Sequence, residues 1–312
     1  MPERILTNID GRQITLTHLD RVVYPQIGIV KAEIINYYLQ IAAYILPHLL
    51  DRPLVFTRYP EGVAKTGFFQ KNAPSYLPVW IDTLPINLNK KYIMVREKAA
   101  LGWLANHGCI EIHPWLSRVK SLTNPDFLVL DLDPSPENTY RQVASAAREL
   151  HRLLNDLKLV SYPKTSGGRG LHIYIPIKAV HSYQSVREAA LAIAGILINK
   201  MPQITTIERV KAKRGNRIYV DCLQIGEGKT LCAPYSLRPS VFATVSTPLQ
   251  WDEVPEFDPT RFTLGNIVDR LEKYGDLFSP VLHDKQALDP VIKAMSLTAA
   301  PMSGGNHQAN VT

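Results

Sequence analysis

The chain has 312 residues, 46% of them hydrophobic, and no stretch approaches the roughly 18 to 20 apolar residues of a membrane span. The 35 Lys and Arg residues exceed the 28 Asp and Glu residues, and the net charge of +7 favours a polyanionic partner. Three cysteines without a CxxC pair, and an N-terminus without a secretory signal, predict a soluble protein of the reducing cytoplasm without a structural zinc site.

Residues 1–125 predict an N-terminal α/β lobe. Short strands and turns are expected up to residue 30, and "KAEIINYYLQIAAYILPHLL" then predicts one helix with Pro47 near its end. Its apolar positions at helical spacing are Ile34, Tyr38, Ile41 and Ile45. From residue 52 to 115 short apolar runs alternate with Pro, Gly and Asn turns, and "KAALGWLANHG" predicts a short helix closed by Gly108.

Residues 126–295 predict the second lobe. "FLVLDLD" is a strand, Ser135 is the expected N-cap of a helix that begins at Pro136, and "LHIYIPI" is the next strand. "SVREAALAIAGILINKM" predicts a second helix, and "RIYVDCLQI" a third strand. This order predicts an α+β fold with a ferredoxin-like or RNA-recognition-type sheet, packed closely against the first lobe across a boundary near Pro125. Residues 296–312 are small and polar, which predicts a disordered tail.

Two aspartates end the strand "FLVLDLD". Side chains alternate along a strand, so Asp131 and Asp133 point to the same face. Asp221 interrupts a second apolar strand, and three carboxylates from two strands can hold two divalent ions, which suits nucleotidyl transfer. The alternative is structural: Asp133 begins a turn with Pro134, and Asp221 is an aspartate on an edge strand.

The segment "YPKTSGGRGLHIYIPI" contains a glycine-rich turn. Its backbone N–H groups can bind phosphate, with Ser166 and Arg169 as side-chain donors, although a plain hairpin turn has the same composition. His172 follows this turn, and His113 lies on a strand face with Cys109 and Glu111. Both histidines are candidates for phosphate or metal binding, and each can equally be a structural residue.

Basic and aromatic side chains surround these positions. Lys211, Lys213, Arg214 and Arg217 precede Asp221, and Lys229 and Arg238 follow it. A basic cleft with an acidic floor suits an enzyme that acts on polyphosphate or nucleic acid. Phe68 and Phe69, between Lys65 and Lys71 in a turn-rich segment, either stack on a base or pack into the core.

Together these segments resemble the polymerase domain of bacterial DNA ligase D and its stand-alone relatives in the archaeo-eukaryotic primase superfamily. The likeness runs from about residue 14 to residue 260. Its markers, in the family's order, are "LTHLDRVVYP", "RYPEGVAKTGFFQKNAP", "GCIEIHPW", "DFLVLDLDPSP", "KTSGGRGLHIYIPI", "YVDCLQI" and "APYSLRP". The resemblance implies primer extension with Mn²⁺ or Mg²⁺, a preference for ribonucleotides, and a role in the non-homologous end joining of double-strand breaks.

The resemblance also implies roles for individual residues. Asp131, Asp133 and Asp221 are the implied ligands of two metal ions, and the residues implied to bind the nucleotide are His113, Ser166, Arg169, His172 and Arg238. Phe68 and Phe69 would stack on templating DNA, Arg21 and Lys31 would bind the 5′-phosphate of a gap, and Lys71 and Arg214 would contact DNA. The sequence departs from the family pattern at His18, Thr57 and Gln224, which affects details of phosphate and nucleotide contact.

The implied partners are DNA with a gap or a 3′ overhang and a 5′-phosphate, an incoming NTP or dNTP, and Ku. The chain ends soon after the likeness stops, so we expect a separate DNA ligase, and we expect the protein in the cytoplasm near the nucleoid. Two alternatives remain. A phosphatase of the haloacid dehalogenase type also uses a DxD motif, but it leaves Asp221 unexplained. A non-catalytic module that bridges DNA ends would bind DNA without metal.

Overall fold

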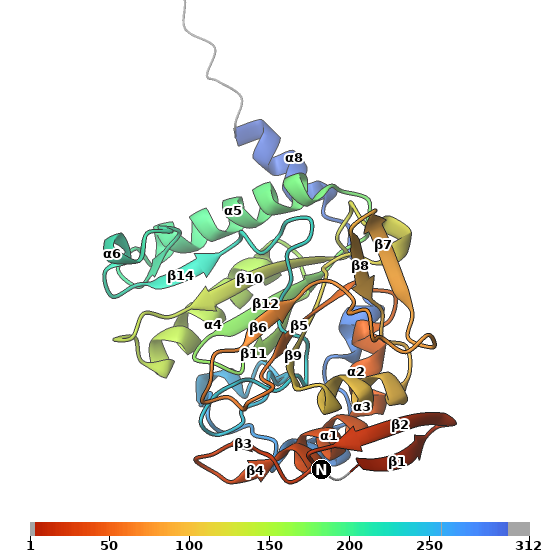
Figure 1. Ribbon diagram of the computed structural model, residues 1–312. Helices are drawn as coiled ribbons and strands as arrows, with labels where there is room; N and C mark the ends of the chain where they lie inside the picture. Colours follow the sequence, from red (N-terminus) through yellow and green to blue (C-terminus); the bar gives the residue numbers. More distant parts are fainter. Residues whose placement is uncertain (1–3, 257, 299–312) are drawn as a thin grey trace, which may run out of the picture.

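The computed structural model describes residues 4–256 and 258–298 (Figure 1). In the N-terminal half the elements are β1 (Arg4–Ile9), β2 (Arg12–Thr17), β3 (Val22–Tyr24), β4 (Ile29–Val30), α1 (Lys31–Gln40), α2 (Ala42–Leu49), β5 (Leu54–Arg58), β6 (Phe68–Gln70), β7 (Thr83–Asn87), β8 (Lys90–Ile93), α3 (Lys98–Asn106), β9 (Cys109–Pro114) and the 3₁₀ helix η1 (Val119–Ser121). Strands β6, β5, β8 and β7 form a sheet in that order, and β9 pairs with β5.

The second half begins at the strand with the two aspartates. Its elements are β10 (Phe127–Asp133), α4 (Tyr140–Asp156), β11 (Tyr162–Thr165), β12 (Leu171–Pro176), α5 (Tyr183–Lys200), β13 (Thr205–Thr206), α6 (Lys211–Arg214), β14 (Ile218–Asp221), η2 (Val254–Glu256), α7 (Ile267–Tyr274), η3 (Ser279–Leu282) and α8 (Asp289–Thr298). The strand order is β11-β12-β10-β14-β13, and only the β13–β14 pair is parallel.

This second sheet confirms the predicted ferredoxin-like or RNA-recognition-type fold. Apart from the two-residue strand β13 and the short helix α6, the chain order from β10 to β14 is strand–helix–strand–strand–helix–strand, and β10 lies between β12 and β14. Helices α4 and α5 pack on one face of the sheet, where both contact β10. Leu128, Leu130 and Leu132 are completely buried, as expected for the strand face that meets the helices. The opposite face carries Asp131, whose side chain is 19% exposed.

The two halves share a core. Buried hydrophobic side chains from both halves belong to one continuous cluster. The segment that follows β14 also crosses to the first half: the Ala233 N–H donates to the Ile112 carbonyl at 2.9 Å, and the Ile112 N–H donates to Ser236 Oγ at 2.9 Å. The lobes are therefore packed as closely as the sequence predicts, and the boundary near Pro125 stays a prediction.

Several helix boundaries differ from the prediction. The single helix expected after residue 30 is divided at Ile41, which ends α1 and caps α2, while Pro47 lies inside α2 without ending it. The expected apolar stripe is nevertheless buried. Helix α4 begins at Tyr140 and not at Pro136, because Thr139 is the N-cap and forms a capping box with Gln142.

The structure adds strands that the sequence did not indicate, β11 and β13, and it places Phe68 and Phe69 on the short strand β6 instead of in a turn. Helix α8 ends at Thr298, and the remainder of the predicted tail, residues 299–312, lies outside the described residues. No helix of the described chain is long and apolar enough to cross a membrane.

Candidate active site

A row of polar side chains crosses the second sheet. Asp131 on β10 lies directly opposite His172 on β12 and Asp221 on β14, and His172 lies opposite Lys164 on β11. Residues directly opposite one another on antiparallel strands point to the same face, with Cβ atoms about 5 Å apart. The row therefore runs Lys164, His172, Asp131, Asp221 on the face away from α4 and α5. Asp133 lies two residues beyond Asp131 on this face.

The three carboxylates have different surroundings. Burial raises the pKa of Asp131 to about 7, and the charges of Asp133 and Asp221 add to the increase. Asp221 accepts hydrogen bonds from the Leu223 N–H at 2.7 Å and from Gln224 Nε2 at 3.2 Å. Asp131 thus carries the least compensated negative charge of the three.

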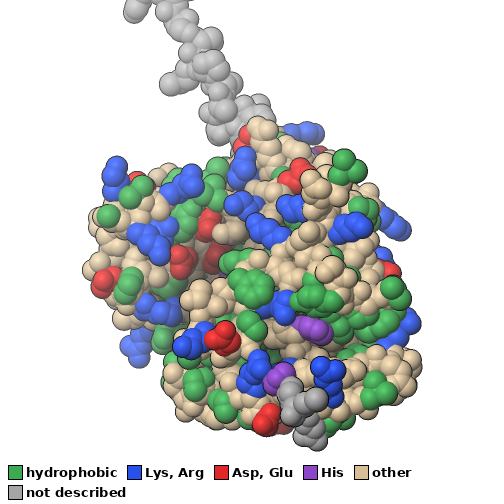
Figure 2. Space-filling model, in the orientation of Figure 1, with side chains coloured by type: hydrophobic (Ala, Val, Ile, Leu, Met, Phe, Trp, Pro, Cys, Tyr) green, Lys and Arg blue, Asp and Glu red, His purple; other side chains and the backbone are tan. Residues whose placement is uncertain are grey.

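Arg214 provides the cation beside Asp133. Its guanidinium lies 3.5 Å from Asp133 Oδ2 and stacks 3.9 Å over the ring of Tyr219. Arg214 is the last residue of the short helix α6, which also contains Lys211 and Lys213. In Figure 2 acidic side chains gather in a hollow at the left of the view, with Lys and Arg side chains around it. Basic side chains therefore lie close to the acidic ones, as the sequence predicts.

These carboxylates fit divalent cations in donor type and pairing. Asp131 and Asp221 lie opposite one another, their oxygens are the ligands that Mg²⁺ and Mn²⁺ prefer, and a cation would relieve the repulsion that raises the pKa of Asp131. Within the described residues no three His, Cys, Asp or Glu side chains already converge as a ligand set.

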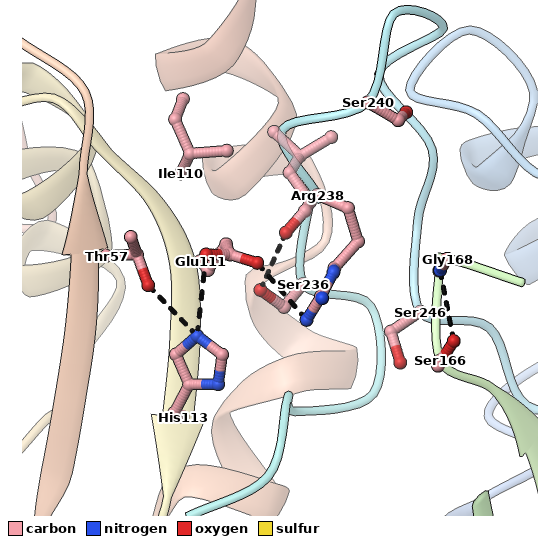
Figure 3. Close-up of polar contacts among 12 residues, drawn as sticks. Thr57, Ile110, Glu111, His113, Ser166, Gly168, Ser236, Arg238, Ser240 and Ser246 are labelled. Atoms are coloured by element: carbon pink, nitrogen blue, oxygen red, sulfur yellow. Dashed lines mark hydrogen bonds and ion pairs between the residues drawn. The ribbon is translucent and has the colours of Figure 1, made fainter. Parts of the chain in front are cut away.

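A second polar group is centred on Glu111 and His113 of β9, with Arg238 and Thr57 beside them (Figure 3). Buried Glu111 stands between two predicted nucleotide ligands: Arg238 is 3.1 Å from Glu111 Oε1, and His113 Nε2 is 3.8 Å from Glu111 Oε2. His113 Nε2 also lies 3.2 Å from Thr57 Oγ1. Burial lowers the pKa of His113 against the opposing effect of Glu111, so its imidazole is mainly neutral at neutral pH.

His172 is the other predicted histidine ligand. Its Nε2 lies 3.6 Å from Asp131 Oδ1, whereas its buried Nδ1 has no hydrogen-bond partner among the described residues. Burial lowers its pKa well below the ordinary value, and the cation of Lys164 adds to this shift. A buried polar atom without a partner is costly, and a ligand group that reached it would remove the cost.

The glycine-rich turn joins β11 to β12 and is stabilised by its own serine. Ser166 Oγ accepts hydrogen bonds from the N–H groups of Gly168 at 3.1 Å and Gly170 at 3.2 Å, so these two donors are already used. Gly167 has φ of +73°, and a Cβ there would lie 2.4 Å from the Arg238 side chain. The turn is thus shaped to lie against Arg238.

Arg169 lies differently from the other predicted ligands. It donates hydrogen bonds to the backbone carbonyls of Ser135, Pro136 and Asn138 at 2.8 to 3.3 Å. These contacts tie the glycine-rich turn to the loop after β10. A role for Arg169 in binding phosphate would require it to leave some of these carbonyls.

Phe68 and Phe69 are exposed on β6, with 47% and 64% of their surface accessible. Packing into the core, one of the two alternatives from the sequence, is therefore wrong for both. The guanidinium of Arg58 lies 5.4 Å from the Phe68 ring centre, and the Phe69 ring is 5.9 Å from that of His113. Stacking on a base, the other alternative, stays a prediction. Lys71, one residue beyond β6, is also exposed.

Arg21 and Lys31, the residues that the resemblance implies for the 5′-phosphate, lie near one another. The Lys31 N–H donates to the Arg21 carbonyl at 2.8 Å, and both side chains line a cavity of about 180 Å³. Arg58 lines it as well, and none of the lining residues is an Asp or a Glu. Burial lowers the pKa of Lys31 to about 8, and the charge of Arg21 lowers it further. The charged groups already donate to backbone carbonyls, Arg21 to Pro60 at 2.5 Å and Lys31 to Thr17, so an anion here would share these donors.

Sequence reasoning left out two residues at the centre of the site, Glu111 and Lys164. The sequence analysis placed Glu111 on the same strand face as His113 but assigned it no role. Its position two residues before His113 was the feature that could have pointed to a shared site. Lys164 had a weaker signal, a charged residue in the mostly apolar stretch that precedes the glycine-rich turn. Only strand pairing shows that this residue is in the row of Asp131.

Comparisons with known proteins agree with this geometry. A family model described as the LigD primase-polymerase domain matches residues 30–278. The multifunctional non-homologous end joining protein LigD of Mycolicibacterium smegmatis is 33% identical over 293 residues, which are 92% of this chain and 38% of that protein. The bifunctional LigD of Bacillus subtilis is 34% identical over 84% of this chain and 43% of that protein. The chain thus spans about two fifths of the length of these relatives.

A solved structure is also similar. The polymerase domain of Mycobacterium tuberculosis ligase D in complex with DNA superimposes with a TM-score of 0.81 and 31% sequence identity. The match covers 88% of this chain and 99% of that one.

Proposed function

Because this chain belongs to the LigD primase-polymerase domain family, we propose that it is a DNA-directed nucleotidyltransferase that extends a primer 3′-hydroxyl at double-strand breaks and short gaps during non-homologous end joining. One observation carries the proposal: Asp131 and Asp221 lie opposite one another on β10 and β14, with Asp133 on the same face. This pairing accounts for Asp221, which the phosphatase alternative leaves unexplained.

The carboxylates of Asp131, Asp133 and Asp221 would hold two divalent ions, Mn²⁺ or Mg²⁺. When bound, such ions lower the pKa of an attacking hydroxyl and stabilise charge on the leaving group. Asp131 lies in the middle of the site, because the residues opposite it on the two adjacent strands, His172 and Asp221, also belong to the site. Arg214 would turn from Asp133 towards the primer end, since a carboxylate that binds a cation no longer needs the guanidinium.

The incoming nucleotide would bind between the two sheets. Arg238 and His113 would meet its triphosphate, with Glu111 fixing both side chains from behind (Figure 3). Ser166 and His172 would complete the site from the second sheet, and Arg169 would contribute by holding the glycine-rich turn.

The DNA would lie over β6 and the cavity lined by Arg21 and Lys31. Phe68 and Phe69 would stack on templating bases, and Lys71 would contact the backbone nearby. Arg21 and Lys31 would bind the 5′-phosphate on the far side of a gap, a dianion that intact duplex lacks. In this proposal the enzyme works near the nucleoid with Ku, and a DNA ligase seals the break.

We further propose that ribonucleotides are preferred. A polar group that receives a 2′-hydroxyl is left unpaired by a deoxy sugar, at a cost of about 1 to 3 kcal/mol. The preference should therefore reach about tenfold in kcat/KM, measured with ATP and dATP on the same primer. Equal efficiency with both nucleotides would contradict this part of the proposal.

Primer extension on gapped DNA with Mn²⁺ or Mg²⁺ tests the function. Wild type should extend the primer, and Asp131→Ala and Asp221→Ala should not, while both variants keep their affinity for DNA because carboxylates hold ions and not phosphates. Extension by either variant above a few per cent of wild type would refute the catalytic role. DNA binding without extension by wild type would favour the end-bridging alternative.

A further inference from the structure

Lys164 is a buried cation in the middle of the candidate site. None of its surface is accessible, and it lies on β11 in the row that continues through His172 to Asp131. Its Nζ donates to Ser246 Oγ at 2.5 Å and lies 3.5 Å from the Thr165 carbonyl. Both acceptors are uncharged, so this ammonium group gains no direct ion pair from them.

The fold around Lys164 does not need the charge. The Thr165 N–H donates to the Thr247 carbonyl at 2.8 Å, and the Leu249 N–H donates to the Pro163 carbonyl at 3.0 Å. The Thr247 N–H also donates to Thr165 Oγ1 at 2.9 Å. These bonds already fasten β11 to residues 245–249, and an apolar side chain of the same length would fill the space of Lys164.

Burying a charge costs several kcal/mol unless nearby groups compensate for it. Burial lowers the pKa of Lys164 to about 8, which reflects that cost. Lys164 interacts electrostatically with five titratable side chains of the described chain. They are Asp131 on β10, His172 on β12, His113 on β9, and Cys232 and Arg238 on the segment after β14. The ring of Tyr174 lies 5.8 Å away. Four of these groups belong to the predicted nucleotide and metal site.

We propose that Lys164 is a positioning residue whose buried charge strengthens binding of the nucleotide triphosphate at Arg238 and His113, without touching the nucleotide itself. The inference rests on the proposed function and adds a residue to its site. A triphosphate carries several negative charges, so a unit cation beneath its ligands adds attraction that grows with the number of phosphates. The same cation acts on adenosine and on the sugar hardly at all.

The test is competition binding, with dye-labelled ATP as probe and ATP, ADP and AMP as competitors, first in EDTA and then with Mn²⁺. Lys164→Met keeps the unbranched shape and removes the charge. It should weaken ATP binding about tenfold, ADP binding less and AMP binding by under twofold, because one charge is lost. Ser246→Ala is the matched control, since it removes the Oγ acceptor of Lys164 and leaves the lysine itself in place, and it should weaken ATP binding less than Lys164→Met does.

Steady-state extension gives a second measurement. Lys164→Met should raise the KM for ATP about tenfold and leave kcat within about threefold of wild type. Equal losses for ATP and AMP, no loss at all, or a loss in Ser246→Ala as large as in Lys164→Met would overturn the proposal.

Folding and function are controlled separately. Lys164→Met and Lys164→Leu should melt at or above the wild-type temperature in EDTA, and a large loss of stability in both would overturn the claim that the fold does not need this charge. If wild type extends no primer but the variants still lose ATP affinity in step with phosphate number, the proposed function fails and the inference stands. If wild type extends primers and the variants bind ATP normally, only the inference fails.

Discussion

Replacing Asp131 with Asn should stabilise the metal-free protein while abolishing primer extension. Asp131 titrates near its ordinary value of 3.8 in the unfolded chain and at about 7 in the fold. The folded state therefore binds this proton more tightly, and the stability that protonation contributes is fully present below pH 3.8 and is lost as the pH rises through 7. Asn resembles the protonated acid in shape and stays neutral, so the variant avoids this loss.

The magnitude follows from the shift. Each pKa unit corresponds to about 1.4 kcal/mol, so a shift of about three units sets an upper limit of about 4 kcal/mol above pH 7. The Asp131 side chain keeps 19% of its surface accessible, and water at this surface screens part of the repulsion. We therefore expect the free energy of unfolding to rise by about 2 kcal/mol, or about 4 °C in Tm for a chain of this size.

Thermal unfolding in EDTA from pH 4 to pH 8.5 measures this effect. The difference in Tm between Asp131→Asn and wild type should grow up to about pH 7 and then level off. Asp252→Asn, at an exposed position outside the site, should show no such growth. Mn²⁺ should raise the Tm of wild type and not that of Asp131→Asn. The reasoning would be refuted if Asp131→Asn were less stable than wild type at pH 8, or if the difference in Tm did not change with pH.

Three further predictions concern DNA binding and the turn. Arg21→Ala/Lys31→Ala should lose the wild-type preference for a gap with a 5′-phosphate over one without it, a loss of about 2 to 4 kcal/mol in duplex affinity, and no preference in wild type would mean that the site is misassigned. Phe69→Ala should weaken binding to single-stranded template by about 1 to 3 kcal/mol in anisotropy titrations, and unchanged affinity would show that the exposed ring does not stack. Gly170→Ala should reduce both Tm and extension, because its Cβ would meet the Leu132 carbonyl oxygen at 2.3 Å; wild-type values of both would indicate that the turn can move away from β10.

Local patterns in the sequence were sufficient for much of the catalytic lobe. The alternation along "FLVLDLD" placed Asp131 and Asp133 on one face, because side-chain direction in a strand depends only on neighbouring peptide units. In the N-terminal lobe, the apolar spacing of Ile34, Tyr38, Ile41 and Ile45 likewise predicted which helix face is buried. Even the strand and helix order was sufficient to predict the sheet type, since few topologies accommodate it.

Helix boundaries were less certain because a local signal can be used elsewhere. Ser135 and Thr139 both have the chemistry of an N-cap. Ser135 Oγ instead donates to the carbonyls of Gly215 and Arg217, on the segment before β14, so Thr139 caps α4. The start of α4 therefore depends on hydrogen bonds between Ser135 and residues about eighty positions later in the chain.

Residue type and local spacing were enough to select the three acids, the aromatic pair and the basic residues as candidates, and to place Asp131 and Asp133 on one strand face. That Glu111 meets Arg238, and that Lys164 lies buried in the row of Asp131, could be seen only in the folded chain. Such contacts depend on strand pairing and on the meeting of distant segments, whose register is set by packing over the whole core and not by any one stretch of residues.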